Sequence, residues 1–144
     1  MARVPFAKRE NLTPAGQQIW DEIESSRGGV ARNYAALLNN PEAAGKMATL
    51  GGYVRFETPL DARVKSLVIL TAAREANGHY VWTVNQRSAR EAGLTSETIS
   101  AIREFRAPVG LDPGDAEAVQ FVLELLRQHR VSGATFEALR SRIG

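Results

Sequence analysis

Three times along this chain, a side chain that caps helices stands directly before a proline. The pairs are Thr13-Pro14, Asn40-Pro41 and Asp112-Pro113. Thr, Asn and Asp accept hydrogen bonds from the free N–H groups of a first helical turn, and proline suits the first helical position because no N–H is needed there. The pairs therefore predict three helix starts.

Apolar residues recur at helical spacing after each of these starts and after several other breaks in the chain. We predict helices over 14–27, 34–38, 41–57, 61–76, 79–92, 95–105, 113–130 and 132–143. The helix over 61–76 is apolar on most of its circumference, so we expect it to be central. No segment alternates apolar and polar residues between hairpin signals. Together with a length of 144 residues, this predicts one all-α domain over 1–144.

The predicted third helix contains the pair Gly51-Gly52. Glycine inside a helix costs about 1 kcal/mol relative to alanine. We therefore expect another backbone to pack closely against this pair.

Composition excludes several kinds of function. The chain has no cysteine, which excludes disulfides, zinc-thiolate sites and a thiol nucleophile. Its two histidines, His79 and His129, lie far apart and outside any metal-binding motif, so we expect no metal site. The net charge is only +2, and basic residues alternate with acids, so nucleic acid is not the expected partner.

Neither a signal peptide nor a membrane span is predicted. The first ten residues hold no apolar stretch of signal-peptide length, and the longest apolar run, 67–73, is too short to cross a bilayer. We therefore expect a cytoplasmic protein with no membrane partner.

A series of short motifs resembles the carboxymuconolactone decarboxylase and AhpD-like family. In chain order they are Arg27-Gly28-Gly29-Val30, Leu37-Leu38-x-x-Pro41, Gly52-Tyr53-Val54-Arg55-Phe56, Tyr80-x-Trp82 and Asn85-x-x-x-Ala89-x-x-Ala92-Gly93-Leu94-Thr95. The resemblance implies an AhpD-like helical bundle that assembles into trimers or hexamers, with pockets near subunit contacts. It also implies one of two chemistries: cofactor-free decarboxylation of lactone acids, or thiol peroxidase activity through a Cys-x-x-Cys-x-x-x-His motif and a glutamate on the preceding helix.

Every residue of the peroxidase motif is substituted in this chain. The cysteine positions fall on Gly78 and Val81, the histidine on Asn85 and the glutamate on Ser66. The chain cannot form a sulfenic acid or a disulfide, which excludes thiol peroxidase activity. Ser66 and Asn85 do not titrate near neutral pH, but both can donate hydrogen bonds to a carboxylate or an enolate oxygen.

His79 is the titratable residue that survives beside this motif. Trp82 and Gln86 follow it at helical spacing on the same side. An imidazole there can act as general acid or base, or it can simply make a structural hydrogen bond at the start of a helix.

Other side chains offer substrate contacts, each with a structural alternative. Arg55, or else Arg63, can hold a substrate carboxylate or lie in solvent or a subunit contact. Tyr80 and Trp82, with Tyr53, can wall a pocket or pack in a core or interface. Glu75, or else Glu57, can replace the missing carboxylate. Glu75 can orient the His79 imidazole or form a surface pair with an arginine.

These residues and the resemblance are compatible with two kinds of function, an enzyme and a non-catalytic protein. The first is a cofactor-independent lyase, decarboxylase or isomerase acting on a small carboxylated substrate, a lactone or an acid like those of aromatic catabolism. His79 would move a proton, Ser66 and Asn85 would stabilise developing negative charge, and Arg55 would bind the substrate acid. The alternative is a non-catalytic small-molecule-binding or assembly protein on the same scaffold. A nucleic-acid binder, suggested only by the pI near 9.3, ranks below both.

Overall fold

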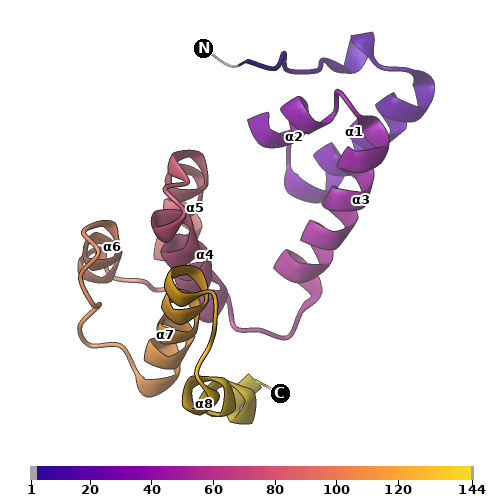
Figure 1. Cartoon of the computed structure of the whole chain (residues 1–144). Helices are drawn as coiled ribbons and strands as arrows, with labels where there is room; N and C mark the ends of the chain where they lie inside the picture. The colour runs from indigo at the N-terminus through magenta and orange to yellow at the C-terminus, as the bar shows by residue number, and fades with distance from the viewer. Residues whose placement is uncertain (1–2, 144) are drawn as a thin grey trace. The chain divides into compact units, whose positions relative to one another are not determined.

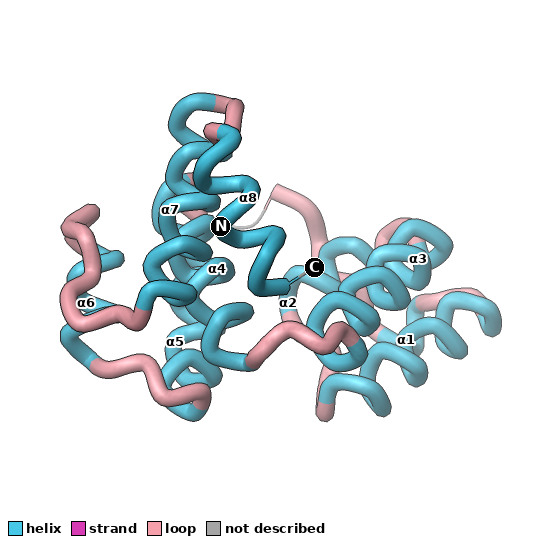
Figure 2. The backbone as a smooth tube through the Cα atoms, turned by 90° about the horizontal axis from the view of Figure 1, so that it is seen from below, coloured by secondary structure: helices cyan, strands magenta, loops and turns pink. Residues whose placement is uncertain are grey.

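The computed structural model describes residues 3–143, and the prediction of an all-α fold is confirmed (Figures 1 and 2). The α-helices are α1 (Pro14–Arg27), α2 (Arg32–Leu37), α3 (Pro41–Gly52), α4 (Ala62–Glu75), α5 (His79–Glu91), α6 (Ser96–Arg103), α7 (Pro113–Gln128) and α8 (Gly133–Ile143). Two short helical segments are η1 (Arg9–Asn11) and η2 (Tyr53–Glu57). Within residues 3–143 there is no strand.

The three predicted capping pairs all begin helices. Thr13, Asn40 and Asp112 each accept a hydrogen bond from the backbone N–H three residues further on, at 3.2, 3.2 and 2.9 Å. A proline occupies the first turn in each case. The caps satisfy N–H groups that a helix leaves without internal partners, so these boundaries follow from local sequence.

The predicted third helix is divided into two parts. Regular α-helix ends at Gly52, and the chain continues through η2, a wider π-helical turn in which the N–H of Thr58 reaches the carbonyl of Tyr53 at 3.1 Å. Arg55 lies on this turn, and its side chain is exposed.

Side chains, rather than a second backbone, approach the glycine pair in α3. A β-carbon added to Gly51 would lie 3.2 Å from the Tyr34 hydroxyl, and one added to Gly52 would lie 3.6 Å from the Arg27 guanidinium. Arg27 is itself fixed, because it donates to the Ala48 carbonyl at 2.6 Å. The expectation of close backbone packing is therefore wrong: the glycines leave room for a phenol and a guanidinium.

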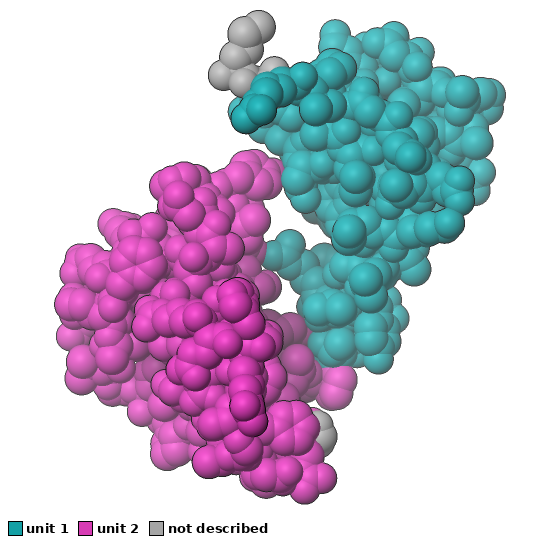
Figure 3. Space-filling model, viewed as in Figure 1, with its two compact units in different colours: residues 1–58 teal, residues 59–144 magenta. Residues whose placement is uncertain are grey.

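The chain forms two compact units, Met1–Thr58 and Pro59–Gly144 (Figure 3). In the first, helices α1 to α3 enclose a small core of Ile23, Leu38, Ala44 and Ala48. In the second, α4 packs against α5, α6 and α7, and α8 packs on α7. The core of the second unit consists of Leu67, Leu70, Ala89, Leu94, Ile99, Ile102 and Val119. The prediction of a central 61–76 helix is confirmed within this unit.

Candidate functional site

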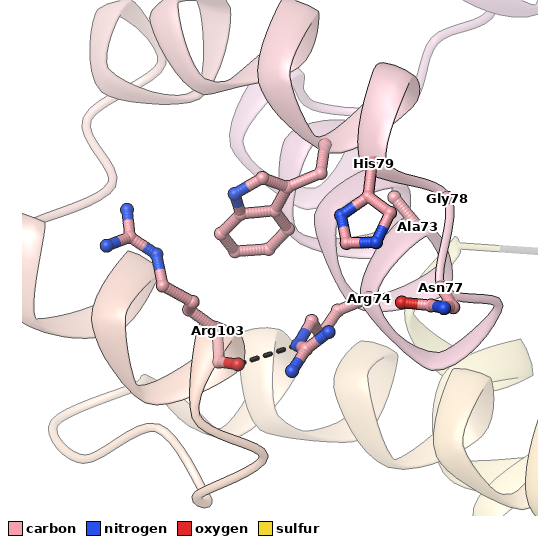
Figure 4. A pocket seen from close by; sticks show the side chains of 7 residues that line it. Ala73, Arg74, Asn77, Gly78, His79 and Arg103 are labelled. Atoms are coloured by element: carbon pink, nitrogen blue, oxygen red, sulfur yellow. Dashed lines mark hydrogen bonds between the residues drawn. The ribbon is translucent and has the colours of Figure 1, made fainter.

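A pocket of about 280 Å³ lies in the second unit, where α4 ends, α5 begins and α6 ends (Figure 4). Its lining residues are Ala73, Arg74, Asn77, Gly78, His79, Trp82 and Arg103. Two of these, His79 and Trp82, belong to the site predicted from the sequence. The pocket therefore joins the predicted histidine to residues that the sequence did not single out.

A tight turn between α4 and α5 places His79 at this pocket. Asn77 adopts the left-handed conformation with φ +53°, and the N–H of Gly78 donates to the Ala73 carbonyl at 2.7 Å. A β-carbon on Gly78 would lie 3.3 Å from that carbonyl oxygen, a contact that a backbone atom cannot easily relieve. Glycine therefore lets α5 begin close to the last turn of α4, with His79 as its first residue.

Two arginines give the pocket its charge. The Arg74 Nε donates to the backbone carbonyl of Arg103 at 2.6 Å, the contact drawn as a dashed line in Figure 4. The Arg74 guanidinium also lies 3.9 Å from the centre of the Phe105 ring. The Arg103 guanidinium lies 6.0 Å from the ring of Trp82, with the geometry of a weak cation–π contact.

No carboxylate lines this pocket among the residues that the structure describes. In that part of the chain, none of the ion pairs includes Arg74, Arg103 or His79. Two guanidinium groups therefore share a concave site without an acidic partner from within residues 3–143. Such a site favours an anionic ligand.

The residues predicted to stabilise developing charge lie elsewhere in the second unit. Ser66 is half-buried on α4, two turns before Arg74, and does not line the pocket. Asn85 is buried on α5 with 8% of its surface exposed, and its amide donates to the Val81 carbonyl at 2.8 Å. Their catalytic roles stay predictions, and the pocket around His79 does not include them.

The residues predicted to bind substrate are also dispersed, apart from Trp82. Glu75 forms a two-bond ion pair with Arg127 on α7, each bond 2.7 Å long, so the structure shows the alternative in which Glu75 pairs with an arginine. Tyr80 follows His79 but is exposed outside the pocket lining. Arg55 belongs to the other compact unit.

The alternatives to these residues have structural or surface positions. Arg63 forms an ion pair of 2.6 Å with the buried Asp115 and also donates to the Gly93 carbonyl, so both contacts tie it to structure. Tyr53 and Glu57 lie exposed on η2 in the first unit.

Sequence reasoning missed Arg74 and Arg103. A signal for Arg74 was present, because it occupies the last turn of α4 only five positions before His79. Arg103 gave no such signal, since it lies 29 residues from Arg74 and meets it only through tertiary packing.

Within residues 3–143, no group of three or more His, Asp or Glu side chains is arranged to hold a metal ion. No helix in the same range is long and apolar enough to cross a membrane.

The fold and the pocket define an all-helical protein with a small basic cavity beside the turn that joins α4 to α5. Comparison with known families makes this more specific: the model of the carboxymuconolactone decarboxylase family matches residues 41–124. The match covers more than half of the chain, which therefore belongs to this family. A search of curated proteins and a search of solved structures gave no match.

Proposed function

We propose that the protein is a cofactor-independent lyase or isomerase of the carboxymuconolactone decarboxylase family that acts on a small carboxylated substrate in the pocket of the second unit. The observation that carries the proposal is the position of His79. Its imidazole shares a pocket with two guanidinium groups, and no carboxylate from the described residues lines it. A proton-transfer group beside an anion-binding surface is the minimum that such chemistry requires.

The proposed steps follow from those groups. The positive charge of the two arginines attracts the anionic substrate, and the indole of Trp82 covers its apolar part. In a decarboxylation, the bond to the carboxylate carbon breaks, carbon dioxide leaves, and the electron pair passes into an enolate formed with an adjacent carbonyl of the substrate. His79, acting as the general acid, then gives a proton to the enolate carbon. An isomerisation uses the same group to remove a proton and return it at another carbon.

A non-catalytic binding protein on the same scaffold is the second candidate. One observation favours it: Ser66 and Asn85, which occupy the positions of the family's motif glutamate and histidine, do not line the pocket. On that alternative, the pocket binds a small acid without changing it.

The test begins with thermal-shift measurements against lactone acids, muconate-like diacids and related aromatic acids. Each stabilising ligand is then incubated with the protein and followed by mass spectrometry. We expect loss of carbon dioxide or a change of isomer, and we expect His79→Gln to lower turnover roughly a hundredfold or more. His129→Gln is the matched control, because His129 is exposed at the end of α7 and outside this pocket.

The outcomes separate the candidates. Unchanged turnover in His79→Gln would remove this residue from the mechanism. Stabilising ligands that are never converted would support the binding protein instead.

We also propose that the chain forms a single family domain and assembles with itself into a trimer or hexamer. The family match crosses the boundary between the compact units, which supports one domain.

Five large apolar side chains on α3 and η2 are more than half exposed, namely Met47, Leu50, Tyr53, Val54 and Phe56. Apolar surface of this kind is typical of protein contacts. Light scattering coupled to gel filtration tests this proposal, and a monomer at all concentrations would contradict it.

A further inference from the structure

Arg74 is the fixed cation of the pocket. One edge of its guanidinium is used by the hydrogen bond from Nε to the Arg103 carbonyl, and the Phe105 ring lies 3.9 Å away. In the described part of the chain, the terminal nitrogens Nη1 and Nη2 of Arg74 make no further hydrogen bond. A guanidinium held in this way presents a rigid pair of donors, which is the arrangement that grips a carboxylate with two parallel hydrogen bonds.

Arg103 contributes charge without the same fixed geometry. Its side chain is exposed, and its guanidinium lies 6.0 Å from the ring of Trp82. The attraction of an exposed cation for a ligand is screened by salt, and holding such a side chain in one conformation costs entropy. We therefore expect it to strengthen anion binding less than Arg74 does.

A purely structural role is the alternative for Arg74, because its two contacts join α4 to the end of α6. Phe105 has φ +56°, a conformation that is strained for a bulky residue, so this loop needs something to hold it. A residue that only joins α4 to the end of α6, however, does not need to place its positive charge in the wall of a pocket. The pocket that Arg74 lines also contains Asn77 and His79 and offers no carboxylate from the described residues.

We propose that Arg74 is the carboxylate-binding residue of this pocket, that Phe105 and the backbone of Arg103 position its guanidinium, and that the indole of Trp82 contacts the planar body of the ligand. The ligand class is a small planar carboxylate. This inference uses the site of the proposed function, but it concerns binding alone and is tested without turnover.

Trp82 supplies the signal for the experiment. The chain has two tryptophans, so Trp20→Phe leaves Trp82 as its only indole. Benzoate and benzamide are similar in size and shape, and only benzoate carries a charge. We expect benzoate to change the fluorescence of Trp82 with a dissociation constant in the millimolar range, as befits so small a ligand, and benzamide to bind far more weakly. Titration calorimetry on the chain with both tryptophans gives the same comparison without this substitution.

The variants separate binding from tethering. Arg74→Gln should weaken benzoate binding about tenfold or more, because it removes a charge-assisted hydrogen-bond pair. Arg74→Lys should weaken it several-fold, since it keeps the charge but loses the planar fork. Phe105→Leu should also weaken it several-fold without changing any charge. The control is Arg106→Gln, a neighbouring exposed arginine that is already paired with Glu104 and should leave benzoate affinity unchanged.

Three results would overturn the inference. Benzamide and benzoate could bind equally well, or neither could bind. Alternatively, Arg74→Gln and Arg74→Lys could lower the melting temperature while the folded variants bind benzoate like the parent protein, which would show a tether only. A carboxylate that binds through Arg74 but is never converted would count against the proposed enzyme and leave this inference standing.

Discussion

Replacing Arg63 with methionine should destabilise the second unit by about 3 kcal/mol, because it leaves a buried carboxylate without its cation. The side chain of Asp115 is only 3% exposed, whereas that of Arg63 is 30% exposed, and their ion pair measures 2.6 Å. Breaking a buried pair from one side typically costs about 3–5 kcal/mol.

Two features of the structure place the expected loss at the lower end of that range. Arg63 is partly open to water, so solvent can replace some of its attraction for the carboxylate. Asp115 also lies in the first turn of α7, where the helix dipole favours negative charge by about 0.3–1 kcal/mol. The loss of the hydrogen bond from Arg63 to the Gly93 carbonyl acts in the opposite direction.

The assay is urea unfolding followed by the fluorescence of Trp82 in a Trp20→Phe background, because Trp82 lies in the same unit as the ion pair. With a slope of about 2 kcal/mol/M, the midpoint should fall by about 1.5 M. Arg106→Met is the matched control, since its pair with Glu104 has both side chains 55% exposed and should contribute under about 1 kcal/mol.

If Arg63→Met costs no more than Arg106→Met, the pair does not stabilise the fold as argued. If stability is unchanged while carboxylate affinity falls, Arg63 is the substrate anchor that the sequence also suggested.

Three further predictions concern single positions. Hydrogen bonds from Gln120, the Ser132 N–H and Thr135 lower the pKa of Glu124 from 4.5 to about 2. The ionised Glu124 therefore stabilises the fold fully above pH 4.5, and this stabilisation is lost as pH falls toward about 2. In urea unfolding, the difference in stability between the parent protein and Glu124→Gln should shrink over that pH interval. Leu70→Ala should cost about 2–5 kcal/mol in the same assay, because Leu70 is fully buried. Gly78→Ala should lower stability by about 1 kcal/mol and weaken benzoate binding, because its new β-carbon meets the Ala73 carbonyl. Calorimetry on the folded variant checks both effects.

The positions of the helices were predictable because their signals are local. Thr13, Asn40 and Asp112 cap helices through bonds that span only three residues. The absence of cysteine likewise excluded a thiol mechanism without any structure. His79 and Trp82 could be placed at one site because they lie three residues apart on one helix.

Tertiary structure alone decided which charges pair and which line the pocket. Glu75 meets Arg127, and Arg63 meets Asp115, each across 52 residues of sequence. Arg74 meets the Arg103 carbonyl across 29. Local sequence fixes which side of a helix a side chain occupies, but its partner depends on which other helix packs there. For that reason the histidine of the candidate site could be predicted from the sequence, whereas its arginines became visible only once α4, α5 and α6 were packed together.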